Sequence, residues 1–60
     1  MTKEEIELAL GDCLGVFDAA NCPFTDWERE FLISIDEQYS SRGGISEKQQ
    51  ERLQKIWDKI

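Results

Sequence analysis

The sequence lacks histidine altogether and has one proline and two cysteines among its 60 residues. Histidine is the commonest general base, nucleophile activator and zinc ligand at neutral pH, so its absence removes the usual means of catalysis and metal binding. The cysteines, Cys13 and Cys22, are too few for a disulfide framework. We expect two free thiols, and a redox pair is the alternative. The chain is therefore expected to act without a metal or cofactor, and not as an enzyme.

A long apolar run is also missing, because no stretch approaches the roughly 20 residues that a membrane-spanning helix needs. The first residues include Glu4 and Glu5, where a signal peptide would have a basic start followed by an apolar stretch. These features predict a cytoplasmic protein with no membrane contact. Sixty residues at 40% hydrophobic and 33% charged composition predict one globular domain over residues 1–60.

Negative charge dominates, with a formal net charge of −6, but it is unevenly placed. Residues 1–24 hold five acids and one base, residues 25–41 also five and one, and residues 42–60 hold three acids and five bases. An acidic body with a basic last segment argues against general binding to a nucleic-acid backbone, although a local basic contact remains compatible with it.

The same short motif marks three helix starts: a Ser or Thr followed three positions later by Glu or Gln. This is the capping box, in which each side chain bonds a free backbone N–H of the first turn. The three pairs are Thr2 with Glu5, Thr25 with Glu28, and Ser46 with Gln49. Apolar residues then recur at steps of three and four, and no segment alternates with period two. The pattern predicts an all-α three-helix bundle with helices over residues 3–19, 26–40 and 47–60.

The breaks between these helices come from proline and glycine. Pro23 cannot continue a helix, and the pair Gly43-Gly44 supplies the left-handed conformation that closes one. Each helix is apolar on one side only and is too short to be stable alone, so the three must pack on each other. We expect five aromatic residues to supply most of the buried area: Phe17, Phe24, Trp27, Phe31 and Trp57.

Some residues remain outside this core and are candidates for binding. In the second helix Ile33 falls among acidic residues, which predicts either an ordinary exposed side chain or an anchor that docks on a basic protein surface. The first helix offers Leu8 on its outer side as a further apolar contact. The predicted partner-binding residues are Leu8, Asp26, Glu30, Ile33 and Glu37.

Two other features have competing interpretations. A basic row along the third helix either solvates the surface or contacts phosphates or an acidic partner, and it comprises Lys48, Arg52, Lys55 and Lys59. Gly11 and Gly15 lie inside the first helix, where each costs about 1 kcal/mol relative to alanine. They indicate either a weak helix or the close approach of a second copy, which would form a homodimer through this side.

The stretch from Phe24 to the end carries a resemblance. It reads Trp-Glu, then an aromatic three residues after the Glu, a Ser and a Gln, a glycine loop, Ser-x-Lys-Gln, and a Leu…Ile…Lys helix. This resembles a short segment found in phage and prophage proteins beside DNA replication or recombination modules. The resemblance covers residues 24–60 and implies a helical hairpin, a mobile-element origin and a bacterial host cytosol. It implies no catalytic residue.

Three functions are compatible with these observations. The one we favour is a protein-binding module of phage type that modulates a host or phage protein acting on nucleic acid, and an inhibitor of a defence system fits this class. The alternative is a nucleic-acid-binding accessory module that uses the basic row. The third is a structural homo-oligomer.

Overall fold

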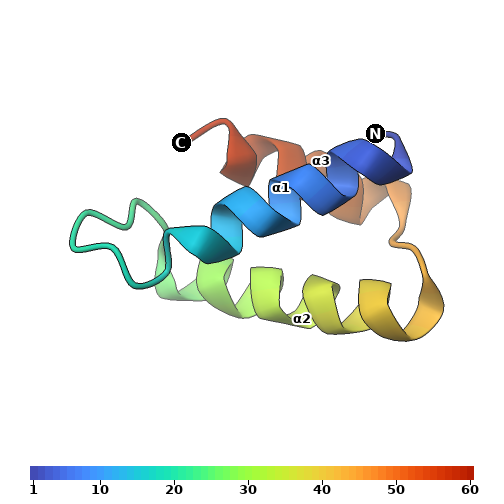
Figure 1. The fold of residues 1–60 in the computed structure, drawn as a ribbon, viewed down its shortest axis with the longest axis horizontal. Coiled ribbons are helices and arrows are strands. Elements are labelled where there is room, and N and C mark those ends of the chain that lie inside the picture. The colour runs from blue at the N-terminus through green and yellow to red at the C-terminus, as the bar shows by residue number, and fades with distance from the viewer.

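The computed structural model describes all 60 residues of the chain. It contains three helices and no strand. They are α1 (Lys3–Gly15), α2 (Asp26–Arg42) and α3 (Glu47–Trp57). Figure 1 shows α1 crossing α3, while α2 runs along the opposite side and antiparallel to α3. Each helix packs against both others. The predicted all-α three-helix bundle is therefore confirmed.

All three predicted capping boxes are formed in both directions. In α2, the hydroxyl of Thr25 accepts from the backbone N–H of Glu28 at 3.2 Å, and the Glu28 carboxylate accepts from the backbone N–H of Thr25 at 2.9 Å. Each box satisfies backbone donors that have no partner inside the helix, which is why all three helices begin where the sequence predicted.

The helix ends differ from the prediction. The first helix ends at Gly15 rather than at residue 19, and the chain continues in tight turns in which N–H groups bond three residues back, as from Phe17 to Leu14 at 3.3 Å. Glycine weakens the helix at this point, and the turn allows Phe17 to pack edge-on against Phe24 with ring centroids 6.4 Å apart. The prediction of a longer first helix was wrong.

At the second helix the error is in the other direction. The helix α2 continues two residues beyond the predicted residue 40, to Arg42. It ends because Gly43 takes φ 79°, and the Gly43 N–H then donates to the Tyr39 carbonyl at 2.7 Å. The third helix, α3, ends at Trp57 rather than at the predicted residue 60, and Ile60 is 49% exposed.

The core is aliphatic rather than aromatic. It contains nine buried residues: Ile6, Ala9, Leu10, Cys13, Phe24, Leu32, Ile35, Leu53 and Ile56. Phe17, Phe31 and Trp57 pack against its edge and are only partly buried. Trp27 is 56% exposed, so its assignment to the core was wrong. Most of the hydrophobic stabilisation therefore comes from branched aliphatic side chains.

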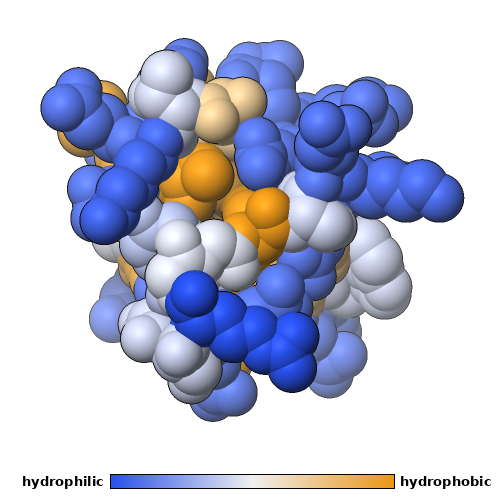
Figure 2. All heavy atoms as spheres, turned by 90° about the vertical axis from the view of Figure 1, so that its right-hand side faces the viewer, coloured by the Kyte–Doolittle hydropathy of each residue, from blue (hydrophilic) through white to orange (hydrophobic).

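Hydrophilic side chains cover the remaining surface. Figure 2 views the end of the molecule where α2 passes into α3, and the most hydrophobic atoms appear there mainly in a small central opening among hydrophilic ones. The larger exposed hydrophobic side chains elsewhere are Leu8, Trp27, Ile33 and Ile60. These four, with their charged neighbours, define where a partner could gain hydrophobic contact.

Candidate interaction surfaces

The acidic stripe of α2 comprises Asp26, Glu30, Ile33 and Glu37. Steps of four, three and four residues keep these side chains within about 60° of one another around the helix. All four are exposed, and Ile33 is 48% exposed. The only ion pair in the structure joins Lys59 to Glu28, so none of the three carboxylates of the stripe has a cationic partner in the chain. The stripe is therefore an uncompensated negative surface around an aliphatic side chain.

Leu8 lies apart from this stripe, on another helix. It is 59% exposed and, with Gly11 and Gly15, occupies the side of α1 opposite the buried Ile6 and Leu10. A Cβ atom built at either glycine would meet nothing within 4 Å. This outer side of α1 is open, and the glycines are not required for packing within the chain. The structure thus groups four of the five predicted partner-binding residues and leaves Leu8 on a separate surface.

The basic row lies on the flank of α3 that faces α2, and two of its four members have partners there. The Lys59 Nζ, beyond the end of α3, is 2.7 Å from Glu28 Oε1. This hydrogen bond, together with the one from the Thr25 backbone, lowers the pKa of Glu28 below its usual value. The Arg52 guanidinium lies over the Trp27 ring, 5.4 Å from its centroid.

Lys48 and Lys55 form the remainder of the basic row. Both are exposed and have no ion-pair partner. With Arg52 and Glu51 they line a shallow hollow of about 250 Å³ on the surface of α3. The row predicted from the sequence is therefore one continuous flank, in which two lysines remain free to contact another molecule.

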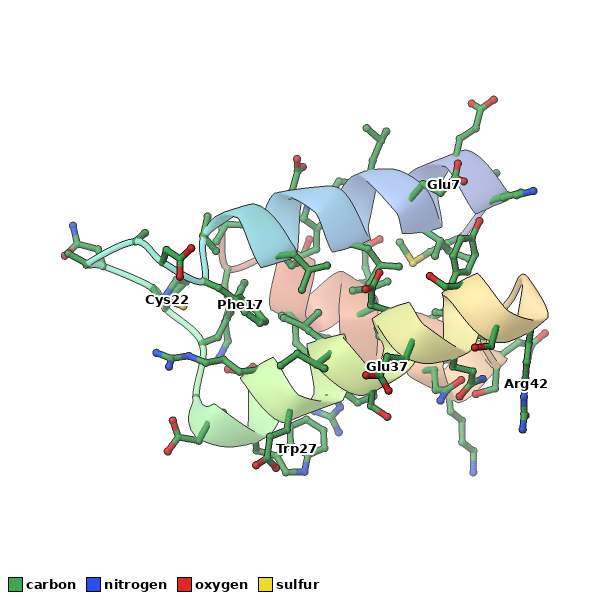
Figure 3. All side chains as sticks on the ribbon, turned by 60° about the horizontal axis from the view of Figure 1, so that its bottom comes forward. Glu7, Phe17, Cys22, Trp27, Glu37 and Arg42 are labelled. Carbon is green, nitrogen blue, oxygen red and sulfur yellow. The ribbon has the colours of Figure 1, made fainter.

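Trp27 is a surface residue that sequence reasoning placed in the core. Its ring stacks on that of Phe31 with centroids 5.3 Å apart and planes 11° apart, and Arg52 covers part of it. Figure 3 shows Trp27 projecting from the side of α2 turned away from α1. Only the register carries a signal for this position: Leu32 and Ile35 define the core side, and Trp27 lies about 140° and about 80° from them around the helix, about a third of a turn from the centre of that side.

Polar side chains fix α3 against the other two helices. The amides of Gln38 and Gln49 exchange two hydrogen bonds of 3.0 Å across the α2–α3 contact. The same Gln49 oxygen accepts from the Ser46 backbone N–H at 2.8 Å, so one residue both caps α3 and joins it to α2. On the other flank, Trp57 Nε1 donates to Asp12 Oδ2 at 3.0 Å and links α3 to α1. The relative position of α2 and α3, and thus of their surface charges, is well defined.

The remaining hollows are shallow and polar. One of about 510 Å³ is lined by Met1, Glu47, Gln50, Glu51, Gln54 and Lys55. Another of about 330 Å³ is lined by Ser34, Glu37, Gln38, Ser41 and Arg42. No group of three or more thiol or carboxylate side chains is placed to hold a metal ion. None of these surfaces resembles the concave, largely apolar pocket typical of a small-molecule site.

The two cysteines are free thiols in different surroundings. Cys13 is completely buried in the core, whereas Cys22 is partly exposed in the segment before α2. Burial, and then the nearby Asp12 carboxylate, raise the pKa of Cys13 to about 11. Cys13 is therefore protonated at neutral pH and has the character of a packing residue.

No family model, curated protein or solved structure matches this chain. No helix of the structure has both the length and the hydrophobicity needed to cross a membrane.

Proposed function

We propose that this protein is a non-enzymatic interaction module that binds, through the acidic stripe of α2, a basic surface of a protein acting on nucleic acid. The observation that carries the proposal is the uncompensated state of the stripe: three carboxylates without a cationic partner surround the half-exposed Ile33. A partner with Lys and Arg at matching positions would neutralise the carboxylates and cover the isoleucine.

The carboxylates and the isoleucine of the acidic stripe have different roles in binding. Exposed carboxylates steer encounter with a basic surface and raise the association rate, but each pair contributes little affinity. Ile33 can supply affinity when it is desolvated at the centre of the contact, as interface anchors are. Because the stripe lies on a helix held by two others, little conformational entropy is lost on binding.

The partner class follows from charge and from the resemblance of residues 24–60 to phage DNA-metabolism segments. Proteins that handle nucleic acid carry basic clefts for the phosphate backbone, and an acidic helix can occupy such a cleft. Binding of this kind would inhibit the partner by excluding its substrate. An inhibitor of a host defence system is one member of this class, and its site of action is the bacterial cytoplasm.

The test is an affinity experiment in which a tagged copy of the protein retains such a partner. Its retention is compared with that of a tagged variant in which Asp26→Asn, Glu30→Gln and Glu37→Gln neutralise the stripe. We expect wild type to retain a nucleic-acid-processing protein, a DNA oligonucleotide to displace it, and the variant to lose it. The matched control neutralises three exposed carboxylates elsewhere, Glu4, Glu47 and Glu51. Equal retention by both variants, or no displacement by DNA, would contradict the proposal.

Ile33→Ser gives a second, charge-neutral test. This residue is on the surface, so we expect the change to leave the free energy of unfolding within about 0.5 kcal/mol of wild type. Loss of an anchor should weaken partner binding at least about tenfold. Leu8→Ser is the control, because Leu8 is also exposed, at 59%, but lies on α1. Equal weakening by Leu8→Ser would place the contact elsewhere.

A second candidate function is nucleic-acid contact by the basic row. The exposed Trp27 beside Arg52 favours it, since bases stack on such rings while cations contact phosphates. The engagement of Lys59 by Glu28 counts against it, because only Lys48, Arg52 and Lys55 then remain for phosphates. We expect at most weak binding of single-stranded DNA that falls steeply with salt, measurable by amide shifts in α3.

A further inference from the structure

The α2–α3 face of the molecule has opposite charges along its two edges. One edge is the flank of α3 with Lys48 and Lys55, and the other is the α2 stripe with Glu30 and Glu37. Trp27 lies between the two edges, because Arg52 reaches it from α3 and Glu30 follows it by about a sixth of a turn on α2. A face with a basic edge, an aromatic middle and an acidic edge is complementary to itself.

The spacing of the charges strengthens this complementarity. Glu30 and Glu37 are seven residues apart, and so are Lys48 and Lys55, which places both pairs about 10.5 Å apart along their helices. Because α2 and α3 run antiparallel in each chain (Figure 1), a two-fold axis parallel to the helices places α2 of one copy antiparallel to α3 of the other. Such an axis keeps each residue at its own height, and within each chain Gln38 lies level with Gln49. Counted from this pair, Glu30 of one copy comes within about two residues of Lys55 of the other, and Glu37 within about two of Lys48.

The surface relief of the two helices agrees with such a contact. The hollow of about 330 Å³ on α2 is lined in part by Glu37, and the hollow of about 250 Å³ on α3 is lined in part by Lys48 and Lys55. The α3 hollow is basic, because three bases and one acid line it, whereas the α2 hollow is polar and holds Glu37 together with Arg42. In such a contact Glu37 of one copy reaches the basic hollow of the other. Both free lysines acquire a carboxylate partner, which neither has within its own chain.

We propose that this protein forms a weak symmetric dimer through the α2–α3 face, with α2 of each copy packed antiparallel on α3 of the other. The inference does not depend on the identity of the partner proposed above. Trp27, half-exposed in the single chain, is covered near the two-fold axis at one end of the contact, and four carboxylate–lysine pairs form along the rest of it. This surface differs from the Gly11 and Gly15 side that the sequence suggested for a homodimer.

Sedimentation of the purified full-length chain tests the dimer. The measurement uses an ionic strength of about 0.1 M, where the Debye length is about 10 Å. Repulsion between two chains of net charge −6 is then screened over the molecule's 17–19 Å width, but the contacting pairs are not. With mostly exposed charge pairs, we expect a dissociation constant on the order of 0.1–1 mM.

Charge reversal gives the decisive result. Glu30→Lys places two lysines opposite each other at both contacts, and Lys55→Glu does the same with two glutamates. We expect each variant alone to associate at least about tenfold more weakly than wild type. An equimolar mixture should regain association, because the mixed dimer restores both Glu–Lys contacts. The double variant carrying both changes should also dimerise. Only a direct contact between positions 30 and 55 of two copies predicts this pattern.

Glu4→Lys and Lys3→Glu are the matched controls, because they change the net charge by the same amounts on α1. They should leave association unchanged, and circular dichroism should show wild-type helix content in every variant. The proposal is overturned if wild type is monomeric at about 1 mM, or if the mixture of reversed variants does not associate. It is also overturned if Leu8→Glu, rather than the reversals, abolishes the dimer. A monomer whose α3 amides shift on addition of an oligonucleotide would assign the basic flank to nucleic acid instead.

Discussion

Truncation of one core leucine should destabilise this domain much more than removal of an entire tryptophan. Leu53 is completely buried between the helices, and Trp27 is 56% exposed. At about 0.05–0.15 kcal/mol per residue, a 60-residue chain has a free energy of unfolding of roughly 3–9 kcal/mol. Leu53→Ala removes buried methyl groups and leaves a cavity, at a cost of about 3–5 kcal/mol. That is at least about a third of the total.

Trp27→Ala removes a stack on Phe31 and a contact with Arg52, but neither is in the core. Exposed interactions of these kinds contribute about 0.5–1.5 kcal/mol and 0.5–1 kcal/mol, so we expect a loss of about 1–2 kcal/mol. Urea unfolding followed by circular dichroism measures both variants. With a slope near 1 kcal/mol/M for so small a chain, Leu53→Ala should lower the midpoint by about 3–5 M and Trp27→Ala by about 1–2 M. A larger loss for Trp27→Ala would refute the assignment of the core.

Three further predictions concern charge, capping and the thiols. Contacts in the folded state lower the pKa of Glu28, so its stabilising contribution is present above the ordinary glutamate pKa of 4.5 and is lost as the pH falls below that value. Measurement of the urea midpoint at decreasing pH should show this loss of stability, and the Glu28→Gln variant should lose less stability over the same pH range. Thr25→Ala removes the α2 cap and should cost about 0.5–2 kcal/mol in urea, whereas Thr25→Ser should be nearly neutral. A thiol reagent at pH 8 should label Cys22 alone in the folded chain and both cysteines in denaturant, because burial keeps Cys13 protonated and inaccessible; rapid double labelling would contradict this.

The parts of the fold that sequence could predict are those set by local chemistry. The capping boxes are contacts between residues three apart, so they need no tertiary information, and all three helix starts were correct. The left-handed Gly43 likewise ends α2 by a local hydrogen bond, although two residues later than expected. The all-α bundle follows from these starts and from helical apolar spacing.

The incorrect predictions concern features that packing between segments determines, namely the end of the first helix and the burial of one tryptophan. Pro23 sets the last residue that the first helix could reach, but the contact between Phe17 and Phe24 and the weakness at Gly15 end it earlier. Trp27 was expected in the core because it lies at a helical step of four from Phe31 and so shares its apolar face. In the structure the buried side of α2 is centred on Leu32 and Ile35, and Trp27 lies beyond its edge, stacked on the partly buried Phe31.

The candidate surfaces also combine features that the local sequence sets with features that helix packing sets. The acidic stripe and the basic row are periodic along single helices, so the sequence could place each of them. Which bases remain free depends on how α3 crosses α2, because only that geometry brings Lys59 to Glu28 and Arg52 to Trp27. The opposing charges of the α2–α3 face become one surface only after the helices are assembled.

Self-association and partner binding draw on the same carboxylates, Glu30 and Glu37, and mass action decides between them. A dimer with a dissociation constant on the order of 0.1–1 mM is almost entirely dissociated at micromolar concentrations, so the acidic stripe is then free for a tighter partner. The two activities can nevertheless be separated in one chain. Glu30→Lys should weaken both, whereas Lys55→Glu changes only the α3 edge and should abolish the dimer while partner retention persists. If Lys55→Glu released the partner as well, the partner would contact both edges of the α2–α3 face, and the acidic stripe alone would not define the binding site.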